Sequence, residues 1–91
     1  MTELLPSKLL ANSENWTKGS YSVDNHGDSV GLSDPSATSF CIVGACMRCG
    51  VFSDKLEQII VARGFTSLEN FNDHPSTTHE DVLSVLLEAG L

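Results

Sequence analysis

Apolar positions are densest over residues 40–47, where eight consecutive residues are apolar or small. In front of this run, Asp34 can cap free backbone N–H groups, and Pro35 suits the first turn of a helix. Behind the run, Gly50 suits a helix stop. We therefore expect a central apolar helix over about 36–49.

Signals for a helix start and a helix stop also surround the segment that follows. Ser53 is a suitable cap, and apolar residues recur at helical spacing up to Arg63. Gly64 then supplies the stop. The segment between Ser53 and Gly64 is predicted to form a helix.

The last helix has the clearest start. Thr77-Thr78-His79-Glu80 matches the capping box, in which Thr77 caps the helix and Glu80 reaches back. One apolar stripe follows it, formed by Val82, Leu83, Leu86 and Leu87. We expect this stripe to pack against one face of the central helix. The residues expected on that face are Phe40, Val43, Gly44 and Met47.

The remaining segments have shorter patterns. Leucines on one stripe predict a short helix over 4–12, and 67–71 reads as a helical turn before a loop over 72–75. Over 16–32, apolar and polar residues alternate on both sides of the turn ending at Gly27, which predicts a β-hairpin.

These elements predict an α+β fold that is mostly α. We expect about four to five short helices around the central apolar helix, with one β-hairpin. The length of 91 residues suits a single compact domain over 1–91.

The chain is acidic, with twelve acids, five bases and a net charge of −7. Binding to nucleic acid or to an anionic membrane needs clustered Lys and Arg, so neither is expected as a direct partner. The apolar runs are too short to span a bilayer, and the first residues lack the basic region of a signal peptide. We therefore expect a cytoplasmic protein.

The charge has a plain interpretation and a sharper one. The plain interpretation is solubility, whereas the sharper one is attraction to the basic surface of a protein partner. Five bases cannot pair most of the twelve acids, so the sharper interpretation predicts that at least three of five acids lie on one face without cationic neighbours: Asp24, Asp28, Asp54, Glu57 and Glu69.

The three cysteines invite a metal site, because Cys46-x-x-Cys49 could join His74 and His79 around zinc. In a helix, Cys41 and Cys46 point about 140° apart and cannot share a metal. The spacing from Cys49 to His74 matches no common zinc motif. A redox role is disfavoured at the C-terminal end of a helix, where the dipole opposes a thiolate. We expect reduced packing cysteines, no metal and no cofactor.

No motif predicts catalysis. The turn over 24–28 lacks the ligand spacing of an EF-hand loop, and the phosphate-binding loops, nucleophile elbows and H-E-x-x-H signatures of known enzymes are absent. A Cys–His nucleophile pair has no support in the spacing. No catalytic residue is predicted.

Several short motifs follow the order seen in a known family. They are W-T-K-G at 16–19, D-P-S-A at 34–37, F-C-I-V-G-A at 40–45, F-N-D at 71–73 and T-H-E-D-V-L at 78–83. Over about residues 9–89 the chain resembles a small bacterial and phage family of unknown function, DUF family 6197. The resemblance implies that Trp16, Asn72, Asp73 and His79 approach one another as a structural cluster or a shallow pocket. It implies no activity.

Three functions are compared. The first is a non-enzymatic acidic domain that binds a protein partner, in one form an anti-CRISPR-like inhibitor from a phage or mobile element that mimics the charge of nucleic acid. The second is a small-ligand-binding or hydrolytic domain that uses Trp16, Asn72, Asp73 and His79 in one pocket. The third is a small zinc module. Acids gathered on one face would favour the first, and a concave site formed by those four residues would favour the second.

Overall fold

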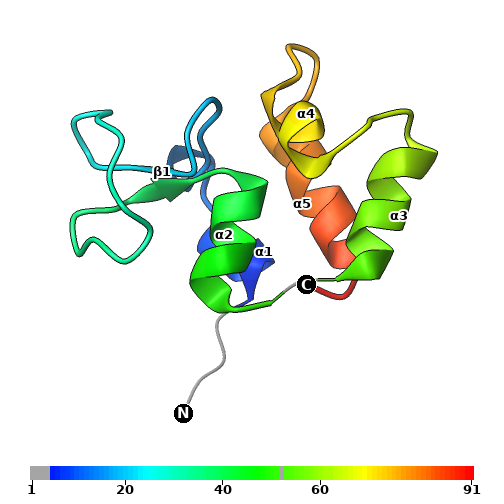
Figure 1. Cartoon of the computed structure of the whole chain (residues 1–91), viewed down its shortest axis with the longest axis horizontal. Helices are drawn as coiled ribbons and strands as arrows, with labels where there is room; N and C mark the ends of the chain where they lie inside the picture. Colours follow the sequence, from blue (N-terminus) through cyan, green and yellow to red (C-terminus); the bar gives the residue numbers. More distant parts are fainter. Residues whose placement is uncertain (1–4, 52) are drawn as a thin grey trace.

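A computed structural model describes residues 5–51 and 53–91, and the helix over residues 42–49 lies near the middle of the molecule (Figure 1). The elements are α1 (Pro6–Leu9), the 3-10 turn η1 (Ser13–Asn15), β1 (Ser22–Val23), β2 (Ser39–Phe40), α2 (Ile42–Cys49), α3 (Asp54–Ala62), α4 (Leu68–Asp73) and α5 (His79–Glu88). The loops next to β1 lie on one side of α2, and α3, α4 and α5 lie on the other. The predicted fold class, α+β and mostly α, is confirmed.

The caps of α3 and α5 follow from their sequences. Ser53 Oγ accepts a hydrogen bond from Leu56 N at 3.3 Å, as expected for the cap of α3. The capping box of α5 is formed by Thr78 and Asp81, whose side chains each accept from the other's backbone N–H at 3.2 and 3.0 Å. The predicted box lay one residue early, because two adjacent threonines and two adjacent acids offer the same spacing twice.

The central helix is shorter than predicted. It begins at Ile42 and not near residue 36, and its cap is Cys41, whose Sγ accepts from Gly44 N at 3.2 Å. Asp34 instead closes a local turn, where its Oδ1 accepts from Ser36 N at 2.8 Å. The C-terminus of α2 is as predicted, because Gly50 takes the left-handed conformation at φ 69°.

Helix α2 starts later than predicted because residues 39–40 form the strand β2. β1 and β2 pair antiparallel, with Ser22 opposite Phe40 and Val23 opposite Ser39. The predicted turn of the 16–32 hairpin is present, with Gly27 at φ 84° and a bridge between Val23 and Ser29. The second strand, however, lies at 39–40 and not within 28–32, so the predicted hairpin range is wrong.

At the first strand the polar residue is the buried one. Tyr21 is 50% exposed, whereas Ser22 is buried. Burial of Ser22 is possible because its hydroxyl donates to the carbonyl oxygen of Val30 at 2.6 Å. Its backbone neighbour Tyr21 lies directly against α2, since a Cβ added to Gly44 would be 2.0 Å from Tyr21 O.

Two shorter elements differ from their predicted ranges. The helix expected over 4–12 covers Pro6–Leu9, and Leu4 lies outside the described residues. Helix α4 continues through Asn72 to Asp73, which were predicted as loop, and the loop begins at His74 before Pro75. Ser7 holds α1 against the last residue, since its N and Oγ both donate to Leu91 O, at 3.1 and 2.8 Å.

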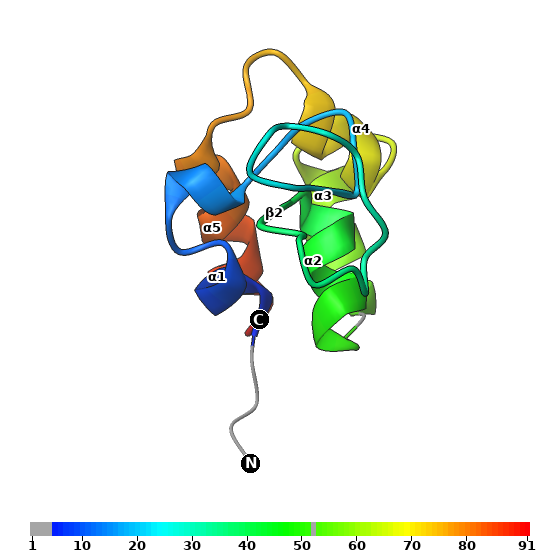
Figure 2. The same ribbon diagram turned by 90° about the vertical axis from the view of Figure 1, so that its left-hand side faces the viewer.

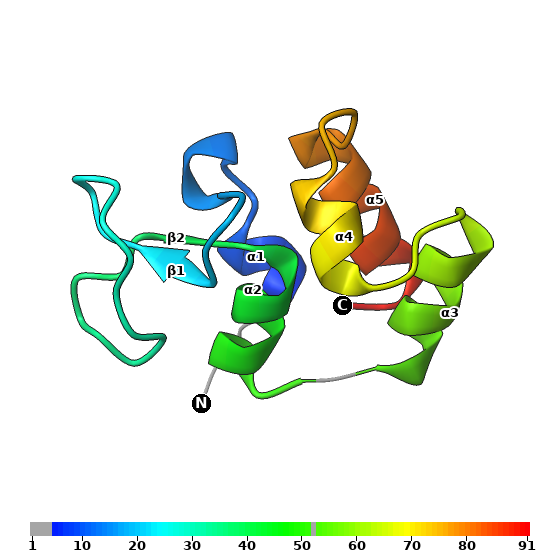
Figure 3. The same cartoon turned by 45° about the horizontal axis from the view of Figure 1, so that its top comes forward.

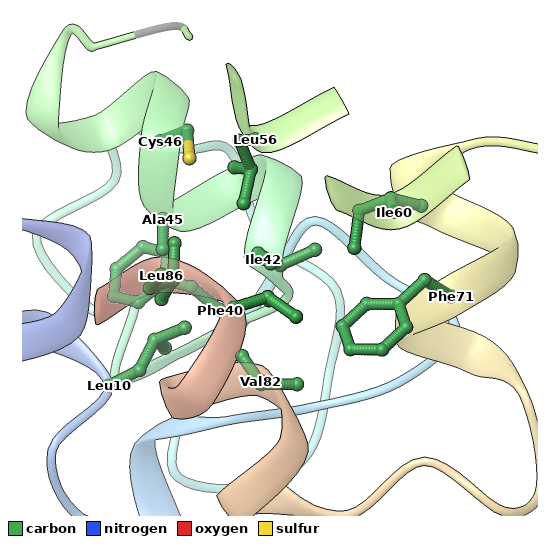
Figure 4. Packing of buried hydrophobic residues seen from close by; sticks show 11 residues of the cluster. Leu10, Phe40, Ile42, Ala45, Cys46, Leu56, Ile60, Phe71, Val82 and Leu86 are labelled. Atoms are coloured by element: carbon green, nitrogen blue, oxygen red, sulfur yellow. The ribbon is translucent and has the colours of Figure 1, made fainter. Parts of the chain in front are cut away.

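Side chains from all five α-helices form the core, part of which Figure 4 shows from close by. The fully buried members are Leu10, Phe40, Ile42, Ala45, Cys46, Leu56, Ile60, Phe71, Val82, Val85 and Leu86. Figure 2 shows α1 next to α5, with α2 across from them. None of the helices in the described ranges combines the length and apolarity needed to cross a bilayer.

The predicted contact between the last helix and the central one is right only in part. Val82 and Leu86 are buried, but Leu87 is 67% exposed. On α2, the core face is built around Ile42 and Ala45, and Met47 is 45% exposed. The face of α2 differs because Gly44 faces the backbone of Tyr21, the residue before β1.

Candidate functional site

The side chain of Asn72 is fully buried near the end of α4 and joins three distant parts of the chain. Its Oδ1 accepts from Trp16 Nε1 at 2.7 Å and from Ile42 N at 2.9 Å. Its Nδ2 donates to Thr17 O at 3.0 Å and to Asp73 Oδ1 at 2.9 Å. A carboxamide offers two donors and two acceptor positions, so all four are filled by the protein.

The other two predicted residues lie around this amide. Asp73 Oδ1 also accepts from Gly19 N at 2.9 Å. The His79 ring lies 6.2 Å from the Trp16 ring, centroid to centroid, and is tilted by 42°. Its Nε2 hydrogen-bonds the carbonyl oxygen of Leu10. The structure thus brings Trp16, Asn72, Asp73 and His79 together, and we call these four residues the Asn72 cluster.

The hydrogen bonds of the Asn72 cluster limit the chemistry that it can perform. Trp16 Nε1, both polar atoms of Asn72 and His79 Nε2 are already bonded within the protein. A general base or a ligand-binding amide needs a free lone pair or N–H directed at the substrate. The cluster therefore connects the segment near Trp16 to α2 and α4, and ligand binding by these residues stays a prediction.

A surface hollow lies next to the Asn72 cluster, between the segment before β1 and helix α4. Its volume is about 230 Å³, and it is lined by Gly19, Ser20, Tyr21, Cys41, Glu69, Asn72 and Asp73. We call it the Tyr21 hollow. Figure 3 shows β1 and α4 on either side of α2. Tyr21 and Cys41 were not predicted as site residues. The exposure of Tyr21 in the fold, 50%, identifies it as a surface group.

The five acids predicted for a partner surface fall into two groups. Asp24 and Asp28 lie in the turn after β1, which the bridge between Val23 and Ser29 closes. Asp24 Oδ1 accepts from His26 N and Asp28 N at 2.9 and 3.0 Å. That carboxylate therefore stabilises the turn. Figures 1 and 3 show this turn and α3 at opposite sides of the molecule, so the five acids do not share one face.

The other three acids lie on the neighbouring helices α3 and α4. Asp54 and Glu57 line one shallow hollow together with Val61, and Glu57 and Glu69 line the next one, again with Val61. Val61 is 63% exposed. We call Asp54, Glu57, Glu69 and Val61 the α3–α4 acidic face.

None of the described cations forms an ion pair with a carboxylate of the α3–α4 acidic face. Arg63 pairs with Glu88 at 3.3 Å, which is the single ion pair among the described residues. Lys18 Nζ donates to His74 O and lies 5.4 Å from the Trp16 ring centroid. Lys55 lines a different hollow, together with Arg63 and Glu88. The carboxylates of the α3–α4 acidic face are thus unpaired with any described cation.

The cysteines are protonated packing residues in this fold. Burial is the main cause that raises the pKa of Cys46 to about 11, and burial also raises the pKa of Cys41. The partly buried Cys49 has its pKa raised by the same cause. Over residues 5–51 and 53–91, no three side chains of His, Cys, Asp or Glu gather closely enough to hold a metal ion. The thiols are therefore neutral near pH 7, the form that is a weak nucleophile.

Comparison with known families gives a match over nearly the whole chain. Residues 7–90 match DUF6197, which is described as a family of unknown function. The chain belongs to DUF6197. The resemblance expected from its short motifs is confirmed. Searches of curated proteins and of solved structures found no match. Because DUF6197 has no described activity, the function of this member has to be argued from its own surface.

Proposed function

We propose that this DUF6197 chain is a non-enzymatic protein-interaction domain whose α3–α4 acidic face binds a basic surface of a partner protein. One observation carries the proposal: Asp54, Glu57 and Glu69 are exposed on neighbouring helices, with no described cation within ion-pair distance. Unpaired like charges repel one another, and a cationic partner relieves that repulsion.

The apolar group within this face adds to the case. Val61 is 63% exposed and lines the same two hollows as the acids around it. Protein interfaces combine an apolar centre, which loses its water on binding, with a polar rim. A basic partner surface with an apolar residue at its centre would complement both features.

A more specific form of this function is an anti-defence role. The partner would then be a host protein whose basic surface normally holds nucleic acid, and the acidic face would compete for that surface by its charge. The net charge of −7 supports this form. It would be tested by adding the purified protein to a CRISPR effector and measuring whether target binding by the effector falls.

The proposal is tested by capture with the immobilised chain. We expect a partner protein to be retained at about 50 mM salt and lost at about 300 mM, because exposed charges are screened over about 10 Å. The triple variant Asp54→Lys, Glu57→Lys, Glu69→Lys should no longer retain it.

The control is a second triple variant, Glu14→Lys, Asp28→Lys, Glu80→Lys, which makes the same change in net charge. These acids are exposed and lie outside the α3–α4 acidic face. Retention by the control and loss by the first variant would support the proposal. Equal loss in both would show that net charge alone drives capture, and unchanged capture by the first variant would contradict the acidic face.

A further inference from the structure

The Tyr21 hollow lies at one end of the α3–α4 acidic face, because Glu69 lines both. Its volume of about 230 Å³ is below the roughly 300–1,000 Å³ typical of sites for drug-sized ligands. The hollow therefore suits one side chain or a similarly small group. Its wall combines the half-exposed Tyr21 with the carboxylates of Glu69 and Asp73.

We propose that the Tyr21 hollow receives a single arginine side chain of the basic partner, with its guanidinium between Tyr21, Glu69 and Asp73. This inference rests on the proposed function and adds to it the position and chemistry of one anchoring contact.

The lining groups match a guanidinium in three ways. A tyrosine ring attracts a cation to its face. Two carboxylates can accept several of the five N–H donors that the guanidinium presents in one plane. The less hydrated guanidinium also enters a partly enclosed site more readily than an ammonium does. Neither Glu69 nor Asp73 forms an ion pair with a described residue, so both charges are available.

The negative charges of Asp73 and Glu69 both act at the wall of the hollow. Burial is the main cause that raises the pKa of Cys41, at the wall of the hollow, and the negative charges of Asp73 and Glu69 raise it further. The electric fields of both carboxylates therefore reach the Cys41 thiol. A cation placed in the hollow would lie within the same negative potential.

Asp73 is already held in position before any partner binds. Its Oδ1 accepts from Gly19 N and from Asn72 Nδ2, both at 2.9 Å. Its second carboxylate oxygen accepts no hydrogen bond from the described residues and remains open to a ligand. A group fixed in advance loses less conformational entropy on binding. The Asn72 cluster thus positions one wall of the hollow.

The test uses ¹⁵N-labelled protein titrated with the blocked tripeptide acetyl-Gly-Arg-Gly-amide. The amide signals of Gly19, Ser20 and Tyr21 should shift in a saturable way. The same peptide with citrulline, which has nearly the same shape but no charge, should leave these signals unshifted. A lysine peptide should bind more weakly than the arginine peptide, because it cannot contact both carboxylates in one plane.

Two variants with the same charge change separate the hollow from general attraction. Glu69→Gln should weaken binding of the arginine peptide about two- to five-fold, the usual range for an exposed ion pair. Glu57→Gln, on the acidic face but outside the hollow, should change it less than about 1.5-fold. Equal weakening by both variants would overturn the inference, as would shifts centred on α3 or an equal response to citrulline.

Failure of the inference differs from failure of the proposed function. If the arginine peptide shifts no signal at the hollow while partner capture still depends on Asp54, Glu57 and Glu69, the anchor is wrong and the acidic face stands. If the peptide binds the hollow but capture ignores the acidic face, the hollow is a cation site and the proposed function is wrong.

Discussion

Replacing Asn72 by alanine tests whether its amide is a structural centre or a free binding group. The change would remove Oδ1, which accepts from Trp16 Nε1 and Ile42 N. It would also remove Nδ2, which donates to Thr17 O. A buried polar group left without a partner costs about 1–3 kcal/mol. Trp16 and Thr17 are only partly buried, so water can reach part of this set, whereas Ile42 is fully buried.

We therefore expect Asn72→Ala to lower the free energy of unfolding by about 2–5 kcal/mol. With a urea m-value of about 1–3 kcal/mol per molar, the unfolding midpoint would fall by more than about 0.7 M. The single tryptophan, Trp16, reports its own surroundings by fluorescence, and circular dichroism reports the helices independently.

Asn70→Ala is the matched control, because it makes the same change two residues earlier on the same helix. Asn70 is exposed, and its side chain donates to Thr66 Oγ1 at the surface. It should cost less than about 1 kcal/mol. A loss below about 0.5 kcal/mol for Asn72→Ala, or equal losses for both variants, would refute the structural role and return Asn72 to the candidates for ligand binding.

Three further measurements test the packing. Gly44→Ala should destabilise the protein by about 1–3 kcal/mol or more in urea unfolding, because its Cβ would lie 2.0 Å from Tyr21 O, whereas Gly31→Ala, with open space around it, should be nearly neutral. Leu86→Ala should cost about 2–5 kcal/mol and Leu87→Ala less than about 0.5, since Leu86 is fully buried and Leu87 is 67% exposed; similar costs would contradict the assigned face of α5. The free energy of unfolding should fall as pH rises from about 9 to 11, because the unfolded thiol of Cys46 loses its proton near 9.0 and the buried one near 11. In the Cys46→Ala variant this part of the fall should be absent, and an unchanged pH profile would count against the buried thiol.

The parts of the fold that the sequence predicts well are those fixed by neighbouring residues. The cap of α3 at Ser53 and the stop at Gly50 depend on side chains within a turn of the helix end. The start of α2 could not be predicted in this way. The start of α2 depends on the pairing of Ser39–Phe40 with β1, across a long loop. Within that loop, the alternation at Val30 and Leu32 favoured a strand there instead.

In the candidate site, too, contacts between distant residues could not be predicted from the sequence pattern. No spacing along the chain connects Trp16 to Asn72, which lie 56 positions apart and bond through Nε1 and Oδ1. Their grouping was expected only from the resemblance to the family. The Tyr21 hollow could not be expected at all, because it depends on Tyr21 facing outward while the smaller Ser22 is buried. In the fold, the buried Ser22 hydroxyl donates to Val30 O at 2.6 Å.

The most direct test of the acidic face is the association rate constant of the captured partner, measured on the immobilised chain at about 50 and 300 mM salt. Attraction between exposed charges acts on association more than on dissociation. We predict that the rate constant falls about ten-fold or more with salt, and that the variant Asp54→Lys, Glu57→Lys, Glu69→Lys has a low rate that salt hardly changes. An association rate that is independent of salt, or that is the same in this variant as in the original chain, would contradict the proposed function.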